Sequence, residues 1–503
     1  MTSGRVRIRL EPLSVEFDVV RDGALIAALA AHGVEFPCGG AGQCGVRVLA
    51  GSLPISEADG SVFTTEQLAQ GWRLACRARA QEPLVLECAQ WRMKILSDAM
   101  AIRPAPATCA RQHKDGLGIA VDLGTTTIAA QLVDLSSGDI LGVETALNPQ
   151  TAFGSDVMSR IRAALEGSDL TTLIRAMLGR LVARLARGRE SEIAEVLLVG
   201  NTVMHHLFCG LEVESLAHVP FQSPHLGEQR FLAPELGWKL STDCRIRFAR
   251  CIGGFVGSDI LAGIVAAGIT QGDGLAALVD LGTNGEIAIG NSNRVVCAST
   301  AAGPAFEAGA IRMGMRAVTG AIAYVSLAER VLHATVIGDV EPRGICGSGL
   351  VDAVAAGLRL GAIQENGRIA NGTKTFPIAP PVVLYQSDIR ELQLAKGAIA
   401  AGFRLLLRRC DACADDLRSI HLAGAFGNYV QIDSAIRIGL IEAPRVLVQT
   451  AGNTALRGAK ILLLAGDEPT LQPIEHISLA ADPAFQDEFA SAMGFSASAA
   501  NTV

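Results

Sequence analysis

A five-residue sequence that occurs twice places the strongest constraint on how this chain can fold. Val121-Asp122-Leu123-Gly124-Thr125 recurs as Val279-Asp280-Leu281-Gly282-Thr283. In each copy the aspartate ends an apolar run and a glycine turn follows, which is the pattern of a strand that enters a tight turn. Predicted strands and helices alternate around both copies. The sequence therefore predicts an α/β fold with a duplicated core, in which each half contributes one hairpin.

The residues of the two turns suit the binding of a nucleotide's phosphates. Glycine lets backbone N–H groups approach a polyphosphate closely, and a carboxylate at a strand end can hold hydrated Mg²⁺. We therefore predict catalytic roles for Asp122 and Asp280, facing one cleft. Phosphate contacts are expected from Gly124, Thr125, Thr126, Thr127, Gly282, Thr283 and Asn284. The alternative is a pair of ordinary β-turns, which favour the same residue types.

Length and composition limit the kinds of protein that this chain can be. Its 503 residues are too many for one core, so several domains are expected. A net charge of −7 gives no electrostatic reason to bind nucleic acid or an anionic membrane. The first residues lack a signal region, and the apolar run at 260–269 is short enough to be a buried helix. Twelve cysteines in such a chain argue against a disulfide framework, so we expect a cytoplasmic protein.

Residues 1–95 have the pattern of a β-grasp domain. Charged and apolar residues alternate over 5–10, and the alternation returns over 15–19, which predicts a half-buried hairpin. A helix is expected from Ala24, followed by a glycine-rich cysteine loop and by strands at 46–49 and 84–86. Polar, Pro/Ala-rich sequence then indicates a linker at 96–116.

The rest of the chain resembles a known superfamily of ATP-binding proteins. Apolar runs predict strands at residues 118–122, 127–132, 194–199, 276–280 and 286–289. Helical spacing of apolar residues predicts helices at 156–165, 170–185 and 394–407. With two phosphate hairpins, this order resembles the acetate and sugar kinases, heat-shock chaperones and actin. Leu422-Ala423-Gly424-Ala425-Phe426-Gly427 resembles their adenosine motif, in which Gly424 and Gly427 would lie against base and ribose. The resemblance implies an ATPase core with segments at 117–212 and 213–503.

The chain also resembles a narrower family, the reductive activators of corrinoid proteins. The resembling stretches are residues 148–150, 153–157, 200–206, 254–259, 299–307, 347–350, 388–390 and 394–396. The resemblance implies that ATP with Mg²⁺ drives reduction of a Co(II) corrinoid protein to Co(I), in support of a methyltransferase system. It implies a corrinoid protein and an external electron donor as partners. The oligomeric state stays open, with a homodimer as one alternative.

In that family the N-terminal domain carries a 2Fe–2S cluster held by four thiolates. Cys38, Cys44 and Cys76 match three of these ligands. The remaining ligand should lie three residues after Cys44, where this chain has Arg47, and Cys88 is the nearest spare thiol. The sequence leaves two alternatives: a cluster with an altered ligand set, or a β-grasp domain that serves for docking and holds no cluster.

Two further pairs have both a chemical and a structural interpretation. Cys410 and Cys413 have the spacing of metal ligands, but no second pair stands nearby, so we expect ordinary thiols. His205 and His206 could form a ligand pair or a general base. We interpret them as packing and hydrogen-bonding residues.

One serine and three carboxylates are candidates to face the reaction. Ser299 lies in a loop of small residues that would let a bulky planar cofactor approach, so its hydroxyl is a candidate to face cobalt. Asp156, Asp259 and Glu286 are alternative candidates to position the attacking water. The sequence does not choose among these three carboxylates.

Four functions remain to be compared. The first is an ATP-dependent activator that reduces a corrinoid protein. The second is an ATP-driven docking protein that remodels a corrinoid partner while a separate ferredoxin supplies electrons. The third is a small-molecule kinase, which would transfer phosphate to an acceptor. The fourth is an activator of 2-hydroxyacyl-CoA dehydratases, a group that lacks an N-terminal ferredoxin domain.

Overall fold

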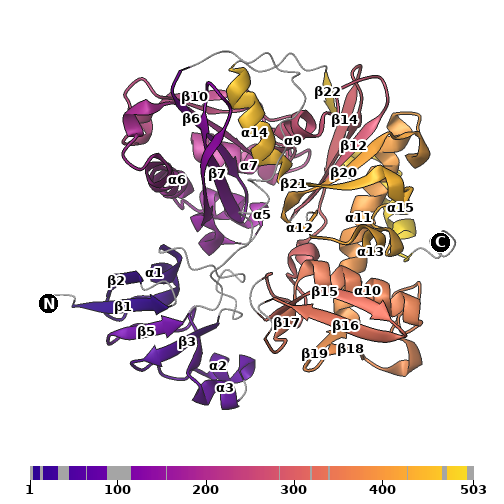
Figure 1. Ribbon diagram of the computed structural model, residues 1–503, viewed down its shortest axis with the longest axis horizontal. Coiled ribbons are helices and arrows are strands. Elements are labelled where there is room, and N and C mark those ends of the chain that lie inside the picture. The colour runs from indigo at the N-terminus through magenta and orange to yellow at the C-terminus, as the bar shows by residue number, and fades with distance from the viewer. Residues whose placement is uncertain are drawn as a thin grey trace.

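The computed structural model describes residues 4–11, 15–31, 45–63, 65–87, 115–154, 156–282, 284–317, 320–337, 340–427, 429–466 and 473–495. Two halves that each contain a large sheet lie side by side, with the N-terminal domain next to the first half and a smaller group of strands next to the second (Figure 1). Within these ranges, every helix is too short or too polar to cross a bilayer.

The N-terminal sheet has the strand order β2-β1-β5-β3-β4. Its elements are β1 (Arg5–Glu11), β2 (Val15–Val20), α1 (Leu25–Ala31), β3 (Gly45–Ala50), α2 (Glu57–Val62), α3 (Thr65–Ala69), β4 (Trp72–Leu74) and β5 (Leu84–Glu87). Strand β1 pairs antiparallel with β2 and parallel with β5, as in a β-grasp domain. The alternating sequence buries Val6 and Ile8 against Leu25 and Leu29 of α1, so the predicted hairpin and helix are confirmed.

The first half is built on a six-stranded sheet in the order β10-β11-β9-β6-β7-β8. Its strands are β6 (Leu117–Leu123), β7 (Thr127–Asp134), β8 (Ile140–Leu147), β9 (Ile193–Gly200), β10 (Gln229–Leu232) and β11 (Arg245–Phe248). Its helices are η1 (Pro149–Phe153), α5 (Val157–Leu165), α6 (Leu170–Ala186), η2 (Glu190–Glu192), α7 (Thr202–Cys209), α8 (Glu214–Ala217) and η3 (Ala233–Leu236). The sheet continues past residue 212, where we expected the first segment to end, because β10 and β11 extend it.

The second half has a six-stranded sheet in the order β21-β20-β12-β13-β14-β22. Its strands are β12 (Ala276–Leu281), β13 (Gly285–Gly290), β14 (Val295–Thr300), β20 (Ser419–Ala423), β21 (Val448–Gly452) and β22 (Ile474–His476). Covering and connecting helices are η4 (Pro304–Glu307), α11 (Gln386–Arg409), η6 (Ala414–Asp416), α12 (Gly424–Gly427), α13 (Ile432–Arg437), η7 (Arg445–Leu447), η8 (Leu479–Ala481) and α15 (Phe485–Ala492).

A smaller group of elements is inserted between β14 and α11. It comprises β15 (Ala321–Ala328), β16 (Val331–Val336), β17 (Gly344–Ile345), α10 (Gly347–Leu360), η5 (Ala370–Gly372), β18 (Thr375–Ala379) and β19 (Val382–Tyr385). Strands β16, β15 and β17 form one small sheet, and β18 and β19 form another. Helix α10 packs on β15 and adds Leu350, Val351 and Val354 to the core of the second half.

The two large sheets repeat one arrangement. The order β11-β9-β6-β7-β8 in the first matches β21-β20-β12-β13-β14 in the second. In each sheet the three consecutive strands that begin with the hairpin pair antiparallel, as β6-β7-β8 and β12-β13-β14. The first of these strands also pairs parallel with a later strand, β6 with β9 and β12 with β20. The predicted duplicated core is therefore confirmed.

Two crossover helices connect the halves. Helix α9 (Ser258–Ala267) leads from the first sheet to β12, whereas α14 (Thr454–Ala465) follows β21 and packs back on β6 and β9. They meet at Gly458, where an added Cβ would lie 2.0 Å from the carbonyl oxygen of Ala262. Only glycine permits so close an approach, and the two helices therefore form one tightly packed unit at the junction.

Candidate active site

The first hairpin, β6 and β7 with the turn Gly124 to Thr127, presents unpaired backbone donors. Leu123 pairs with Ile128, and the Gly124 N–H donates to the Thr127 carbonyl at 3.1 Å. Within the described ranges the N–H groups of Thr125 and Thr126 have no acceptor, and both residues are partly exposed. Free N–H groups in a tight glycine turn are the donors that a phosphate group requires.

Two asparagines hold this turn from the first half. The Asn148 side chain caps η1 by accepting from the Gln150 N–H at 3.0 Å, and its Nδ2 donates to the Gly124 carbonyl at 3.0 Å. Asn201 caps α7 by accepting from Met204 at 3.0 Å, and its Nδ2 donates to Thr125 Oγ1 at 2.9 Å. The turn is therefore fixed by side chains that are themselves fixed by helix caps.

Arg160 of α5 supplies the third support and is fully buried. Its guanidinium donates to the carbonyls of Thr125 and, at 3.3 Å, Gly154. Burial lowers the pKa of Arg160 to about 10, although the charges of Asp156 and Glu307 raise it in part. Arg160 is thus a buried cation directly behind the predicted phosphate turn.

The second hairpin, β12 and β13, has a shorter turn. Leu281 pairs with Gly285, and the Gly282 N–H donates to the Asn284 carbonyl at 3.1 Å. Thr283, a predicted phosphate contact, lies outside the described residues. Gly424 begins α12 with φ +84°, and an added Cβ there would lie 2.5 Å from Asp280 Oδ1. The predicted adenosine loop, Gly424 to Gly427, therefore starts against the second hairpin, and glycine is needed for the fit.

Four carboxylates gather where the halves meet, and we call Asp122, Asp259, Asp280 and Glu286 the carboxylate cluster. Asp122 and Asp280 occupy equivalent positions on β6 and β12, opposite Val199 of β9 and Ala423 of β20. Asp259 comes from the first turn of α9, and Glu286 lies across from Asp280 on β13. The structure therefore brings together both predicted catalytic residues and two of the three candidates for positioning water.

Burial and mutual repulsion set the electrostatics of the carboxylate cluster. Burial raises the pKa of Asp122 to about 6, partly offset by a hydrogen bond from Asn453. Burial and the charge of Asp122 raise the pKa of Asp280 to about 7. Burial, Asp122 and Asp280 raise the pKa of Asp259 to about 8. Repulsion of this kind is typical of carboxylates that share one site.

Glu286 distinguishes the second half from the first. Burial and the charges of Asp259 and Asp280 raise its pKa well above the ordinary value, although hydrogen bonds from Ser299 and Asn284 lower it in part. Ser299 Oγ donates to Glu286 Oε1 at 3.3 Å. In the first sheet the position equivalent to Glu286 is Ala129. Ser299 thus adjoins the cluster, while its predicted approach to cobalt remains a prediction.

Crowded carboxylates of raised pKa fit a site for a cation that lowers their mutual repulsion. Among the described residues, no three Asp, Glu, His or Cys side chains converge closely enough to hold a metal ion directly. Hydrated Mg²⁺ needs only one or two carboxylates, together with water and phosphate oxygens. The donor set of Asp122 and Asp280 therefore fits Mg²⁺ bound with a nucleotide.

Local sequence patterns predicted no role in this site for Asn148, Asn201, Asn453 or Arg160. Asn453 caps α14 and donates to Asp122 Oδ2 at 2.8 Å. The sequence does contain a pattern that could have identified Asn201 and Asn453. Gly-Asn-Thr occurs at 200–202 and again at 452–454, each time where a strand ends and a helix begins.

The remaining candidates have structural roles. Asp156 caps α5 and accepts from the Ser159 N–H at 2.9 Å, so it is committed to the helix end. His206 bonds the Thr202 carbonyl at 2.8 Å and Ser223 Oγ at 2.6 Å, and the buried His205 ring packs edge-on against Phe248. The packing interpretation of this pair is confirmed. Cys410 is half-buried and Cys413 is exposed.

Only part of the predicted cluster site in the β-grasp domain can be placed. Cys76, just after β4, is half-buried, whereas Cys38, Cys44 and Cys88 lie outside the described residues. Arg47 lies within β3, where its Nε donates to the Gln70 carbonyl at 3.0 Å. The position expected for the third ligand is therefore a strand residue with a polar partner. Cys76 is the one thiol that the described part of this domain offers.

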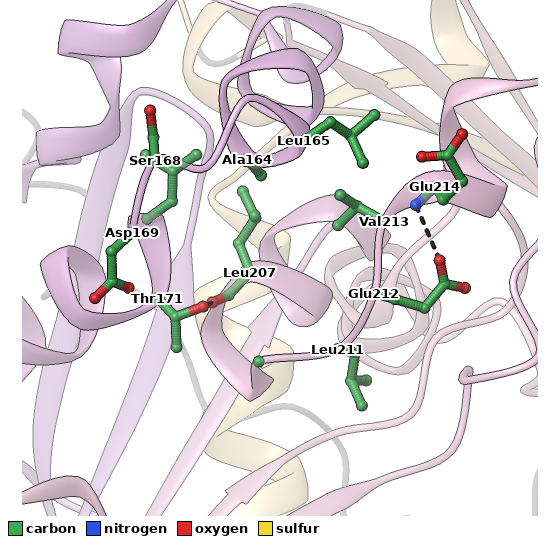
Figure 2. A pocket seen from close by; sticks show the side chains of 12 residues that line it. Ala164, Leu165, Ser168, Asp169, Thr171, Leu207, Leu211, Glu212, Val213 and Glu214 are labelled. Carbon is green, nitrogen blue, oxygen red and sulfur yellow. Dashed lines mark hydrogen bonds between the residues drawn. The ribbon is translucent and has the colours of Figure 1, made fainter.

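A pocket of about 280 Å³ lies elsewhere, among α5, α6, α7 and α8. Figure 2 shows its apolar side chains Leu165, Leu207 and Val213, with Glu212 and Glu214 at one side. Glu212 accepts from the Glu214 N–H at 3.0 Å. None of the sequence-predicted site residues lines this pocket, so it is separate from the carboxylate cluster.

The core is duplicated, and each half has a carboxylate on the equivalent strand. These features define an ATPase-like protein of the sugar kinase and actin class, and the β-grasp domain before the core is ferredoxin-like. Three family descriptions match the chain: "2Fe-2S iron-sulfur cluster binding domain" at 8–81, "RACo middle region" at 117–272, and "C-terminal domain of RACo the ASKHA domain" at 274–503. The chain belongs to the family of reductive activators of corrinoid proteins.

Individual relatives agree with this membership. The chain is 35% identical to the corrinoid activation enzyme RamQ of Eubacterium limosum over 75% of its own length and 70% of that protein. It is 28% identical to the [Co(II) methylated amine-specific corrinoid protein] reductase of Methanosarcina barkeri, over 69% of this chain and 70% of that protein. A solved reductive activator for corrinoid,iron-sulfur protein superposes with TM-score 0.66 at 26% identity, covering 97% of this chain and 98% of that one.

Proposed function

We propose that this chain uses ATP to drive the reductive activation of a corrinoid protein, in which Co(II) gains one electron and becomes Co(I). The observation that carries the proposal is the equivalent placing of Asp122 on β6 and Asp280 on β12, with Asn453 from the second half bonded to Asp122 at 2.8 Å. Relatives named for corrinoid activation and for Co(II) corrinoid protein reduction support the choice of substrate.

Each part of the core has a role in this proposal. The N–H groups of Thr125 and Thr126, with the buried cation of Arg160 behind them, bind the phosphates from the first half. Asp122 and Asp280 hold Mg²⁺ through its water, and the Gly424 to Gly427 loop receives the adenosine. Asp259 and Glu286 remain as candidates for positioning the attacking water, and Asp156 is disfavoured because it caps α5.

ATP can promote an unfavourable reduction only through differential affinity. A nucleotide that binds both halves favours their closed arrangement. ATP then promotes the reduction only if the corrinoid protein binds the open and closed arrangements with different affinities. The electron comes from an external donor, and a 2Fe–2S centre in the β-grasp domain would carry it when present. We expect these events in the cytoplasm, with the oligomeric state open.

A second candidate is an ATP-driven protein that remodels the corrinoid partner and carries no electron itself. Arg47 favours it, because the residue at the third ligand position lies in β3 and bonds the Gln70 carbonyl. Anaerobic purification followed by iron and sulfide assays separates the two candidates. Stoichiometric iron and sulfide would support the first, and their absence in protein that still activates the corrinoid partner would support the second.

ATP hydrolysis with and without a corrinoid protein of a methyltransferase system tests the core of the proposal. We expect Asp122→Asn and Asp280→Asn to lower kcat/KM for ATP by roughly 10–100-fold, the usual effect of losing groups that orient a metal's ligands. Asp352→Asn is a matched control, because Asp352 is a buried carboxylate of α10 whose raised pKa, about 6, arises from burial away from the hairpins. Full hydrolysis by both cluster variants would contradict the proposal.

A further inference from the structure

Three asparagines share one unusual arrangement around the first hairpin. Asn148, Asn201 and Asn453 each accept a helix N–H with Oδ1 and donate with Nδ2 to the hairpin. Their acceptors are the Gly124 carbonyl, Thr125 Oγ1 and Asp122 Oδ2, at 3.0, 2.9 and 2.8 Å. We call these three residues the N-cap asparagines.

The cap fixes which end of each amide faces the hairpin. In Asn453, Oδ1 accepts from the Leu456 N–H at 2.7 Å, and only the oxygen can accept that bond. The Nδ2 group must then point to Asp122, so the orientation of the amide is determined by the helix. Asp122 Oδ2 is thereby occupied, and among the described residues no donor reaches its Oδ1.

Asn453 differs from the other two because it comes from the second half. It follows β21, which belongs to the second sheet, and it begins α14, which packs on the first. Ala459, Leu462 and Leu463 of α14 share a core with Ala120 and Val199 beneath the first hairpin. Close contact of Gly458 with α9 fixes the helix further. The position of the Asn453 amide is therefore tied to both halves.

We propose that Asn453 is a positioning residue. Its bond to Asp122 Oδ2 turns that carboxylate so that Oδ1 faces the Mg²⁺-nucleotide, and it links the orientation of the carboxylate to the position of α14. The inference rests on the proposed function, since it assigns the residue to the same site. Asn148 and Asn201 support it independently, because they fix the neighbouring Gly124 and Thr125 by the same bonds.

Substitutions can separate the cap from the donor. Asn453→Ser keeps an oxygen that can cap α14, cannot donate to Asp122 in the same way, and adds no charge to the carboxylate cluster. Asn453→Ala removes both functions. Asp169→Ala is the matched control for loss of a cap alone. Asp169 caps α6 by accepting from the Thr172 N–H at 2.9 Å, and it lines the pocket that contains none of the carboxylate-cluster residues.

Calorimetric titration of the full chain with ATP, once with Mg²⁺ and once with EDTA, measures the effect without relying on turnover. For Asn453→Ser we expect an ATP affinity in EDTA near that of the wild type. The factor by which Mg²⁺ raises the ATP affinity should fall by about 10-fold or more. Melting temperatures without nucleotide should stay close to the wild-type value for Asn453→Ser. Asp169→Ala should melt earlier and keep the full Mg²⁺ effect.

Other outcomes have distinct meanings. If the wild type binds Mg²⁺-ATP and Asn453→Ser shows the same Mg²⁺ effect, the positioning role is overturned while the proposed function stands. An equal loss with Mg²⁺ and with EDTA would also overturn it, because that result indicates a general distortion of the site. If the wild type itself fails to bind Mg²⁺-ATP, the proposed function falls and the positioning role with it.

Discussion

Single residues of the carboxylate cluster lower the stability of the folded, nucleotide-free protein. Asp122, Asp259 and Asp280 have raised pKa values because burial and mutual repulsion disfavour their charged forms. At neutral pH a water-exposed carboxylate has lost its proton, whereas carboxylates with raised pKa values keep theirs in part when no cation is bound. Binding of Mg²⁺ would displace those protons. Strain of this kind is expected where a site is built for its ligand rather than for the empty protein.

Asp259→Asn should therefore stabilise the nucleotide-free protein at alkaline pH. The folded pKa of Asp259 is about 8 and its ordinary value is 3.8, so its favourable contribution is complete below pH 4 and is lost as pH rises through 8. The amide has no such dependence. We expect the variant to exceed the wild type by about 1–3 kcal/mol in unfolding free energy at pH 8.5, and by less at pH 5. Thermal melts from pH 5 to 8.5 measure this.

Asp156→Asn is the control for that series. Burial raises the pKa of Asp156, but hydrogen bonds from Ser159 outweigh it and lower the pKa overall. Its stabilising effect is present at neutral pH and is lost in acid, which is the opposite sign. A parallel gain for both variants at pH 8.5 would show that repulsion in the cluster does not limit stability.

At the scale of elements, buried ion pairs join β9 to β11 in the first sheet. Glu195 of β9 is almost fully buried and accepts from Arg247 Nε at 2.6 Å. Arg247 Nη1 also bonds Glu228 at 3.0 Å, and the exposed Arg245 reaches Glu195 at 3.2 Å. Residues 245 and 247 face residues 195 and 197 in register, so these bonds hold the parallel pairing.

Arg247→Met should destabilise the chain by about 3–5 kcal/mol, because it leaves the buried charge of Glu195 poorly compensated. Arg245→Met removes a guanidinium from the same carboxylate at an exposed position and should cost under about 1 kcal/mol. The double variant Glu195→Met with Arg247→Met should recover most of the loss. Urea unfolding followed by circular dichroism compares them, and equal effects of the two single variants would contradict this account.

Local periodicity explains why these elements were predictable. The apolar runs at 118–122 and 276–280 became β6 and β12, because burial on both faces of a central strand requires them. Arg160 was missed, because a polar residue on an amphipathic helix suggests exposure, yet two carbonyls compensate for its burial. The Asn453 bond to Asp122 was missed for another reason. An asparagine before a helix is fully explained as a cap, and no local pattern reports a distant second partner.

At the scale of the whole molecule, the β-grasp domain has few described contacts with the core. Helix α1 approaches η1 of the first half, and the Arg343 guanidinium stacks over the Trp72 ring at 4.4 Å from the ring centre. Arg343 precedes β17 of the inserted strands, whereas Trp72 lies on β4, four residues before Cys76. Small interfaces of this kind permit domain motion. The stack therefore brings the ATPase core to the edge of the domain that carries Cys76.

Arg343→Ala should release the β-grasp domain from the second half for part of the time. A cation–π contact contributes about 0.5–1 kcal/mol at an exposed site, so the undocked population should rise about two- to fivefold. Small-angle scattering should show a larger radius of gyration. In a Trp91→Phe background, acrylamide should quench Trp72 fluorescence more strongly, while Trp238 stays buried in the first half. Arg330→Ala removes a charge from the same inserted strands without touching Trp72 and should change neither measurement. Unchanged scattering and quenching in Arg343→Ala would mean that contacts such as α1 on η1 hold the domain, and that Arg343 does not control access to the edge near Cys76.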